Sequence, residues 1–351
     1  MRCLLILTDY NNEFLISINN KNKYVSMNIE KIKGYFISRG YDVNIMQFSE
    51  LDFKRNYEGY YVLYQTSESK GQFYKRYIED IIYYLEINGA VVLPSYKYLK
   101  AHHNKGFMEL LRNTFRDESL KTISSKYYGI PGEALLAEPK FPVVIKQISG
   151  SGSAGVYSAK TRKEYKKYVN KVSKTKISDS YYNLFLTIIK NKIKSFISFI
   201  NPKYCTRPHN NVYRPFIVQN LIQGLPGDYK VLYFGGKYYT LYRKNRKKDF
   251  RASGGGRLYE VPLEENIPLL NFAKKIVSEI DFPIVGMDGE NYHLIEFQMI
   301  HLGPYTLQRS NYYFIWKENK WERINGKSDL EEEFCRSICE YIEFKYLLMD
   351  V

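Results

Sequence analysis

A glycine-rich run is the part of this sequence whose residue types most directly suggest chemistry. Gly150, Gly152 and Gly155 follow the pattern G-x-G-x-x-G, directly after the apolar, β-branched segment 141–147. Glycines let the backbone approach a phosphate closely, and backbone N–H groups then bind its oxygens. Lys146 lies on the incoming segment, where an ammonium group can meet the α- and β-phosphate oxygens of a nucleotide. The run therefore predicts a phosphate-binding loop.

The residues after the glycines separate three kinds of phosphate loop. In a dinucleotide-binding fold the third glycine opens a helix, whereas residues 156–159 are strand-forming and no carboxylate follows about 20 residues on. A protein kinase needs an H-R-D and a D-F-G motif. The sequence has neither, since Asp249 and Phe250 are followed by Arg251 and not by glycine. A Walker A loop needs Gly-Lys-Ser/Thr after the glycines, which is absent too. We therefore expect this run to turn a β-hairpin.

The elements that must position this loop follow two different patterns. The first 95 residues alternate between strand and helix patterns, which predicts an α/β fold class with a parallel sheet. Expected strands there are 2–7, 41–48, 57–65 and 90–95, and expected helices are 26–39 and 76–89. Later expected strands are 141–147, 155–159 and 215–222, with hairpins over 228–246 (turning at Gly235–Gly236) and 283–300. Later expected helices are 104–115, 163–172, 266–280 and one from about 328.

From about residue 95 onward, the chain resembles the ATP-grasp ligases, such as D-alanine–D-alanine ligase, glutathione synthetase and the ribosomal-protein glutamate ligases. The segments that carry the resemblance, in family order, are 102–111, 141–156, 215–232, 242–256 and 285–298. It implies an ATP-grasp fold with an N-terminal parallel α/β pre-ATP-grasp domain. The implied domains are 1–97, 98–218 (with an insert at about 170–212) and 219–351.

The resemblance implies how ATP is bound. Gln219 stands where the family usually has Glu, facing the adenine amino group. The backbone of Asn220 and Leu221 would pair with the adenine edge, and Asp228 would hold the ribose hydroxyls. The complete implied set is Lys105, Lys146, Gly150, Ser151, Gly152, Ser153, Gln219, Asn220, Leu221 and Asp228.

It also implies the catalytic and metal-binding groups. Arg243 and Arg251 match arginines that meet the γ-phosphate and the acyl phosphate, and Lys230 joins them as a catalytic cation. The implied ligands for one or two Mg²⁺ ions are Asp288, Glu296 and Gln298. Mg²⁺ prefers hard oxygen ligands, and it clamps a transferring phosphoryl group while arginines neutralise the phosphoryl oxygens. Gln298 stands where the family usually has Asn, so its carbonyl reaches one methylene further.

Three functions fit these residues. The first is a ligase that uses ATP to turn a carboxylate into an acyl phosphate, which an amine then attacks, with release of ADP and phosphate. The second is an ATP-grasp kinase that phosphorylates a hydroxyl, and the third is a nucleotide-binding module without turnover. The sequence does not identify the carboxylate or the amine.

Charge predicts an anionic partner. Of the net charge of +15, the segment from Lys160 to Pro215 carries about +12, from 14 Lys and Arg against two acidic residues. Within it, residues 181–200 place apolar side chains on one helical face and Lys190, Lys192 and Lys194 away from it. Such a helix either packs on its own domain or lies on an anionic membrane. An anionic or lipid-linked cell-surface precursor would suit it as the acceptor, whereas no nucleic-acid-reading motif accompanies the charge.

The remaining composition predicts a cytoplasmic protein, peripheral to the inner face of the membrane if the insert binds lipid. The four cysteines form no Cys-x-x-Cys pair and suit a reducing compartment. The five histidines show no metal-ligand spacing along the chain. The first apolar run, of about five residues, is shorter than a signal peptide requires, and no run approaches the roughly 20 residues of a membrane span.

Overall fold

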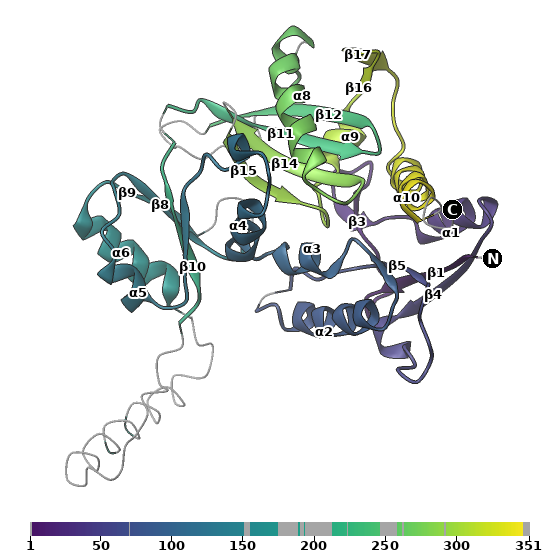
Figure 1. The fold of residues 1–351 in the computed structure, drawn as a ribbon, viewed down its shortest axis with the longest axis horizontal. Helices are drawn as coiled ribbons and strands as arrows, with labels where there is room; N and C mark the ends of the chain where they lie inside the picture. The colour runs from purple at the N-terminus through teal and green to yellow at the C-terminus, as the bar shows by residue number, and fades with distance from the viewer. Residues whose placement is uncertain are drawn as a thin grey trace. The chain divides into compact units, whose positions relative to one another are not determined.

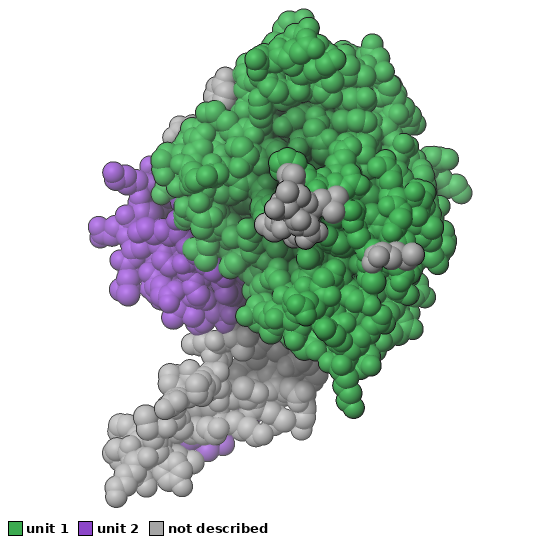
Figure 2. Space-filling view, turned by 45° about the vertical axis from the view of Figure 1, so that its right-hand side comes forward, with its two compact units in different colours: residues 1–124, 151–153, 222–351 green, residues 125–150, 154–221 purple. Residues whose placement is uncertain are grey.

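The chain forms two compact units, which Figure 2 distinguishes by colour. The structure is a computed structural model that describes residues 2–69, 71–150, 155–174, 189, 193, 213–222, 224–245, 258–261, 263–290 and 293–346. The described parts of residues 1–124 and 222–351 make the larger unit, and those of 125–150 and 154–221 make the smaller one. The division into domains at residues 97/98 and 218/219 stays a prediction.

The larger unit begins with a four-stranded parallel sheet of order β4-β1-β5-β6 (Figure 1). Alternate residues of its central strand face opposite sides: Leu4 shares a core with α1, and Leu5 shares another with α2. The elements here are β1 (Arg2–Thr8), β2 (Ile16–Ile18), β3 (Tyr24–Ser26), α1 (Ile29–Ser38), β4 (Tyr41–Gln47), β5 (Tyr61–Tyr64), α2 (Phe73–Ile87), β6 (Val91–Leu93), α3 (Tyr96–Ala101) and α4 (Lys105–Asn113). This confirms the α/β fold class.

The same unit contains an antiparallel sheet of order β15-β14-β11-β12-β16-β17, with β13 paired to β12. Its core is continuous with the one that contains Leu4, which explains why the two ends of the chain form one unit. The elements are β11 (Gly227–Phe234), β12 (Lys237–Lys244), β13 (Leu258–Tyr259), α8 (Leu263–Ser278), β14 (Ile284–Glu290), β15 (His293–Gln298), α9 (Tyr305–Arg309), β16 (Tyr312–Lys317), β17 (Lys320–Asn325) and α10 (Leu330–Tyr346).

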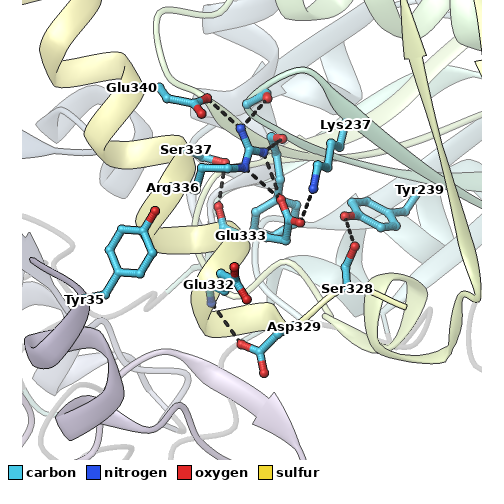
Figure 3. Close-up of polar contacts among 12 residues, drawn as sticks. Tyr35, Lys237, Tyr239, Ser328, Asp329, Glu332, Glu333, Arg336, Ser337 and Glu340 are labelled. Atoms are coloured by element: carbon cyan, nitrogen blue, oxygen red, sulfur yellow. Dashed lines mark hydrogen bonds and ion pairs between the residues drawn. The ribbon is translucent and has the colours of Figure 1, made fainter. Parts of the chain in front are cut away.

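The turn between β11 and β12 lies at Gly235–Gly236, as predicted. Both glycines have positive φ, 45° and 90°, and a Cβ at Gly235 would lie 2.8 Å from Ser337 Oγ. Arg336 of α10 donates to the backbone carbonyls of Phe234 and Gly235 at 2.9 and 3.0 Å and also pairs with Glu333 (Figure 3). The last helix is thus fastened to the turn that starts β12.

The smaller unit is an antiparallel sheet of order β7-β10-β8-β9 with two helices that share its core. Its elements are β7 (Ser125–Tyr128), α5 (Pro131–Leu136), β8 (Val143–Gln147), β9 (Val156–Ala159), α6 (Arg162–Ser173) and β10 (Phe216–Asn220). Within the described parts of both units, no helix is long and apolar enough to cross a membrane.

Candidate active site

One face of the C-terminal sheet, which we call the polar face, carries many of the residues that the sequence indicated. Across β11 and β12, Asp228 lies opposite Arg243. Lys230 lies opposite Asp288 of β14, which in turn lies opposite Glu296 of β15. Side chains that are opposite one another, or two residues apart on one strand, lie on the same face of a sheet. The polar face therefore consists of Asp228, Lys230, Arg243, Asp288, Glu296 and Gln298.

Glu296 lies on the polar face because β15 contains a β-bulge. Asp288 pairs with Glu296, but the next residue, Gly289, pairs with Leu294, so Ile295 is the extra residue. In a regular strand Leu294 and Glu296 would share a face, since they are two residues apart. The bulge instead turns Leu294 into the core, where it is fully buried, and leaves Glu296 beside Asp288.

Arg243 joins the two aspartates of the polar face. Its Nε and Nη2 atoms donate to the two carboxylate oxygens of Asp228 at 2.7 and 2.8 Å. Nη2 also lies 2.8 Å from Asp288 Oδ2, and Lys230 Nζ lies 3.6 Å from Asp288 Oδ1. Asp228, Lys230 and Arg243 are all less than 8% exposed. Bidentate contacts of this kind fix the orientation of a guanidinium group.

Burial and charge shift the pKa values of the two aspartates in opposite directions. Burial outweighs the hydrogen bonds from Arg243 and raises the pKa of Asp228 to about 6. Burial acts on Asp288 in the same direction, but Arg243 and Lys230 together outweigh it and lower the pKa of that carboxyl. Asp288 is therefore held ionised, which is the form that a cation requires.

Lys105 approaches the polar face from α4. Asn104 caps this helix by accepting from the backbone N–H of Phe107 at 3.1 Å, so Lys105 is its first residue. Lys105 Nζ lies 3.4 Å from Glu296 Oε1. Further along α4, the buried Arg112 donates to the backbone carbonyl of Leu294 and pairs with Glu109. This contact fastens the helix to β15 beside the bulge.

The polar face fits a magnesium ion. Asp288 Oδ1 is buried and accepts no hydrogen bond, although Lys230 lies within ion-pair distance of it. Arg243 contacts the other carboxylate oxygen of Asp288, Oδ2, so a metal bound at Oδ1 would leave that contact intact. Gln298 donates from Nε2 to the backbone carbonyl of His301 at 3.2 Å, and its amide oxygen is the atom that Mg²⁺ would take. Asp288, Glu296 and Gln298 would hold the ion.

In the smaller unit, the glycine run joins two antiparallel strands, as predicted. Gly155 has φ of 74°, and a Cβ there would lie 2.5 Å from Gln147 Oε1, so the turn requires glycine. Ile145 packs in the core with the helices. Lys146 is therefore on the opposite face of the sheet, where it lies across from Ile217, and Gln219 shares that face.

The structure describes some of the other predicted site residues and leaves others outside the described ranges. Gly150 has φ of 126°, a conformation that favours glycine. Leu221 already donates its backbone N–H to the carbonyl of Pro142 at 3.2 Å, so in this structure that N–H is not available to adenine. Asn220 is exposed at the end of β10. Asp228 holds Arg243, and its contact with ribose stays a prediction. Ser151, Gly152, Ser153 and Arg251 lie outside the described residues, as does most of the basic insert.

Tyr305 belongs to this site, although the sequence did not indicate it. Its hydroxyl lies 3.5 Å from Arg243 Nη1, and its ring centroid lies 5.9 Å from Lys230 Nζ. The chain has 35 tyrosines, so no local pattern distinguished this one. It reaches the polar face because α9 lies against β11 and β12.

Comparisons with known proteins give the fold its name. No protein-family model matches the sequence, and no curated protein matches it either. Among solved structures, D-cycloserine synthetase DcsG is similar with a TM-score of 0.51 and 11% identity, over 96% of this chain and 99% of that one. D-alanyl-alanine synthetase A from Vibrio cholerae has a TM-score of 0.49 and 11% identity, over 97% and 98%. An ATP-grasp RimK domain protein from Sphaerobacter thermophilus has a TM-score of 0.42 and 11% identity, over 97% and 99%.

The chain therefore has the ATP-grasp fold. A parallel α/β sheet comes first in the chain, and two antiparallel sheets follow. This confirms the fold that the sequence resemblance implied.

Proposed function

We propose that this protein is an ATP- and Mg²⁺-dependent ligase that joins a carboxylate to an amine. The observation that carries the proposal is the polar face, where Lys105, Lys230 and Arg243 alternate with carboxylates on one side of the sheet. Such an array suits phosphoryl transfer, in which catalysis consists mainly of positioning and charge stabilisation. The ATP-grasp fold supports the same chemistry.

The reaction has two steps. A carboxylate oxygen of the first substrate attacks the γ-phosphorus of ATP, and ADP leaves. The amine nitrogen of the second substrate then attacks the carbonyl carbon of the acyl phosphate, and phosphate leaves. In this proposal no side chain of the protein acts as a nucleophile.

The side chains of the polar face bind and orient the reactants. Asp228 holds one edge of the Arg243 guanidinium, so that this charge meets the transferring phosphoryl oxygens without first being reoriented. Lys230 supplies a second cation, and Arg251 is proposed to supply a third. Bound Mg²⁺ would neutralise phosphate oxygens and align them for in-line displacement. Lys105 and Lys146 are proposed to bind the phosphates of ATP.

The acceptor is proposed to be an anionic or lipid-linked cell-surface precursor. This part of the proposal depends on the charge of the segment 160–215 and on the amphipathic pattern of residues 181–200. A segment with a net charge of about +12 creates a positive potential that attracts anions. The same segment is proposed to contact an anionic membrane or another polyanion peripherally.

The experiment is a screen of carboxylate and amine pairs that reads out ADP. ADP release that needs both partners, together with an amide product in the mass spectrum, is the expected result. A stable phosphorylated hydroxyl acceptor would replace the ligase with a kinase. Nucleotide binding without ADP release on any pair would replace it with a binding module.

A further inference from the structure

Three of the five histidines meet at one place in the larger unit. His102 and His103 follow α3, and His301 comes three residues after β15. The ring centroid of His102 lies 4.6 Å from that of His103 and 5.4 Å from that of His301. Glu68, four residues after β5, points a carboxylate oxygen at all three. Spacing along the chain gave no sign of this group, because its members come from three separate segments.

The distances from Glu68 to the three histidines lie on both sides of the distance expected between two ligands of one metal ion. Glu68 Oε1 lies 2.9 Å from His103 Nε2, 3.4 Å from His301 Nδ1 and 3.8 Å from His102 Nε2. Ligand atoms bound tetrahedrally at about 2.0–2.1 Å lie roughly 3.3 Å from one another. The ligand atoms of Glu68, His102 and His103 also lie within 4.8 Å of one another.

Hydrogen bonds around Gln65 show which nitrogen of His301 carries a proton. Gln65 donates from Nε2 to the carbonyl of Phe14 at 2.8 Å, and its Oε1 accepts from the N–H of Thr66 at 3.0 Å. With the amide oriented in this way, its oxygen also accepts from His301 Nε2, which lies 2.8 Å away. In the neutral ring, Nδ1 then has no proton. Its lone pair then faces the carboxylate of Glu68, and two acceptors that face each other repel. A cation bound between them would interact favourably with both.

His102 supplies an independent observation. Its side chain is 2% exposed, and neither ring nitrogen has a hydrogen-bond partner among the described residues. A buried polar group without a partner costs free energy, roughly 1–3 kcal/mol.

We propose that this histidine cluster binds a divalent transition-metal ion, with Zn²⁺ as the best fit. The ligands are Glu68, His102 and His103, whose ligand atoms form the close group, and His301, which lies outside that group but whose Nδ1 is 3.4 Å from Glu68 Oε1. Imidazole nitrogens favour zinc over magnesium, whereas the polar face offers only oxygen ligands, so the two sites select different metals. His103 and His301 both have positive φ, 51° and 52°, a backbone conformation that is uncommon for residues other than glycine. Gln65 would hold His301 in place as an outer hydrogen-bond partner. The site lies beside the polar face, because Gln298 contacts the carbonyl of His301.

The test uses the full-length protein, stripped of metal with a chelator and dialysed. Zn²⁺ is titrated calorimetrically in excess Mg²⁺, which occupies oxygen-only sites, and bound zinc is counted after gel filtration. We expect one zinc per chain and a higher Tm. Co²⁺ then serves as a spectroscopic probe, because a thiolate ligand would add a charge-transfer band that nitrogen and oxygen ligands lack. No step needs turnover, so the result is independent of the ligase proposal.

Variants locate the metal. Glu68→Gln should weaken zinc binding at least tenfold, and the half-exposed position of this side chain lets the fold persist. Gln65→Met removes the outer partner of His301, together with the contacts of Gln65 to the Phe14 carbonyl and the Thr66 N–H, and should weaken binding about 10–100-fold while no proposed ligand changes. His293→Gln is the matched control, since His293 lies in the same unit and contacts Thr122 instead. No bound zinc, a thiolate band, or equal affinity in Glu68→Gln and wild type would each overturn the proposal.

Discussion

Asp288 is the residue on which the charges of the polar face converge. Its side chain is only 19% exposed, and a carboxylate that has lost most of its water needs nearby cations, because desolvation is costly. Arg243 and Lys230 supply them from the neighbouring strands β12 and β11. The proposed magnesium site would therefore carry its negative charge without a bound nucleotide.

Glu296→Gln tests the metal assignment. The change removes one negative charge at almost constant volume, so we expect folding to persist and the Mg²⁺ concentration for half-maximal ADP release to rise at least tenfold, about 1.4 kcal/mol. Glu322→Gln is the control, because Glu322 lies on β17 of the same sheet and pairs with Lys320 at 3.1 Å. Identical magnesium titrations for Glu296→Gln and wild type would remove Glu296 from the site.

Lys146→Ala tests the nucleotide assignment. A hydrogen bond from a charged donor contributes roughly 1.5–3 kcal/mol, so calorimetry should show ATP binding weakened about tenfold or more. Lys126→Ala is the matched control: Lys126 is exposed on the neighbouring part of the sheet, and it shares a face with Ile145 and not with Lys146. Wild-type ATP affinity in Lys146→Ala would mean that this lysine does not contact the phosphates.

Arg112→Leu tests what holds α4, and with it Lys105, beside β15. The change removes the guanidinium group that pairs with the buried Glu109 and donates to the Leu294 carbonyl. Breaking a buried pair in this way costs about 3–5 kcal/mol, measurable as a lower free energy of unfolding in denaturant. The double variant with Glu109→Leu should recover part of that loss.

The control for this prediction is Arg116→Leu. That side chain is 87% exposed, so the change should alter stability by no more than about 0.5 kcal/mol. A similar small effect in Arg112→Leu would show that the buried contact does not hold the helix.

At the scale of elements, the sequence predicted those with strong local signals. The parallel sheet, the glycine-run hairpin and the Gly235–Gly236 turn were all expected. The hairpin of β16 and β17 was not, because its turn residues Glu318 and Asn319 have positive φ without the usual Asn-Gly signal. The bulge at Ile295 was equally hidden, since it depends on pairing with β14. The position of Asp288 and Glu296 on adjacent arms of one hairpin was expected from their motif, and their role as metal ligands stays a prediction. The contacts of Asp228 with Arg243 needed the strand register.

Asp329 offers a test at this scale, because it links two helices. Its carboxylate accepts from the N–H of Glu332 at 3.0 Å, capping α10 (Figure 3), and lies 2.5 Å from Lys31 Nζ of α1. Burial would raise the pKa of Asp329, but Lys31 and the cap together lower it. A lowered pKa in the folded state gives stability that is present above the unfolded pKa of about 3.9 and lost as the pH falls below it.

Two substitutions separate the cap from the ion pair. Asp329→Asn keeps a capping oxygen and removes the charge, so at pH 7 it should cost less than about 1 kcal/mol, since both side chains are more than 40% exposed. Asp329→Ala should cost about 1 kcal/mol more. In urea unfolding the cost of Asp329→Asn should shrink below about pH 4. A cost that is unchanged with pH would rule out the charge as its cause.

At the scale of the whole molecule, the uneven charge is the property that remains to be explained. In the proposed function ATP is bound by close contacts, which salt screens little, whereas exposed charges are screened beyond about 8 Å at physiological salt. A basic segment that serves the acceptor should therefore give salt-sensitive attraction to anionic surfaces and leave nucleotide binding nearly unchanged.

The last prediction changes Lys190, Lys192 and Lys194 to Glu, which lowers the net charge from +15 to +9 because three cations become three anions. The control changes the exposed Lys317, Lys320 and Lys327 to Glu, with the same net charge at a different place. We expect wild type and control to sediment with anionic liposomes at low salt, and the first variant to stay in the supernatant while it binds ATP normally. Equal loss of sedimentation in both variants would mean that net charge alone is responsible. If the wild type ignores anionic liposomes at low salt, the segment serves a different anionic acceptor or packs on its own domain, and the proposed membrane contact is wrong.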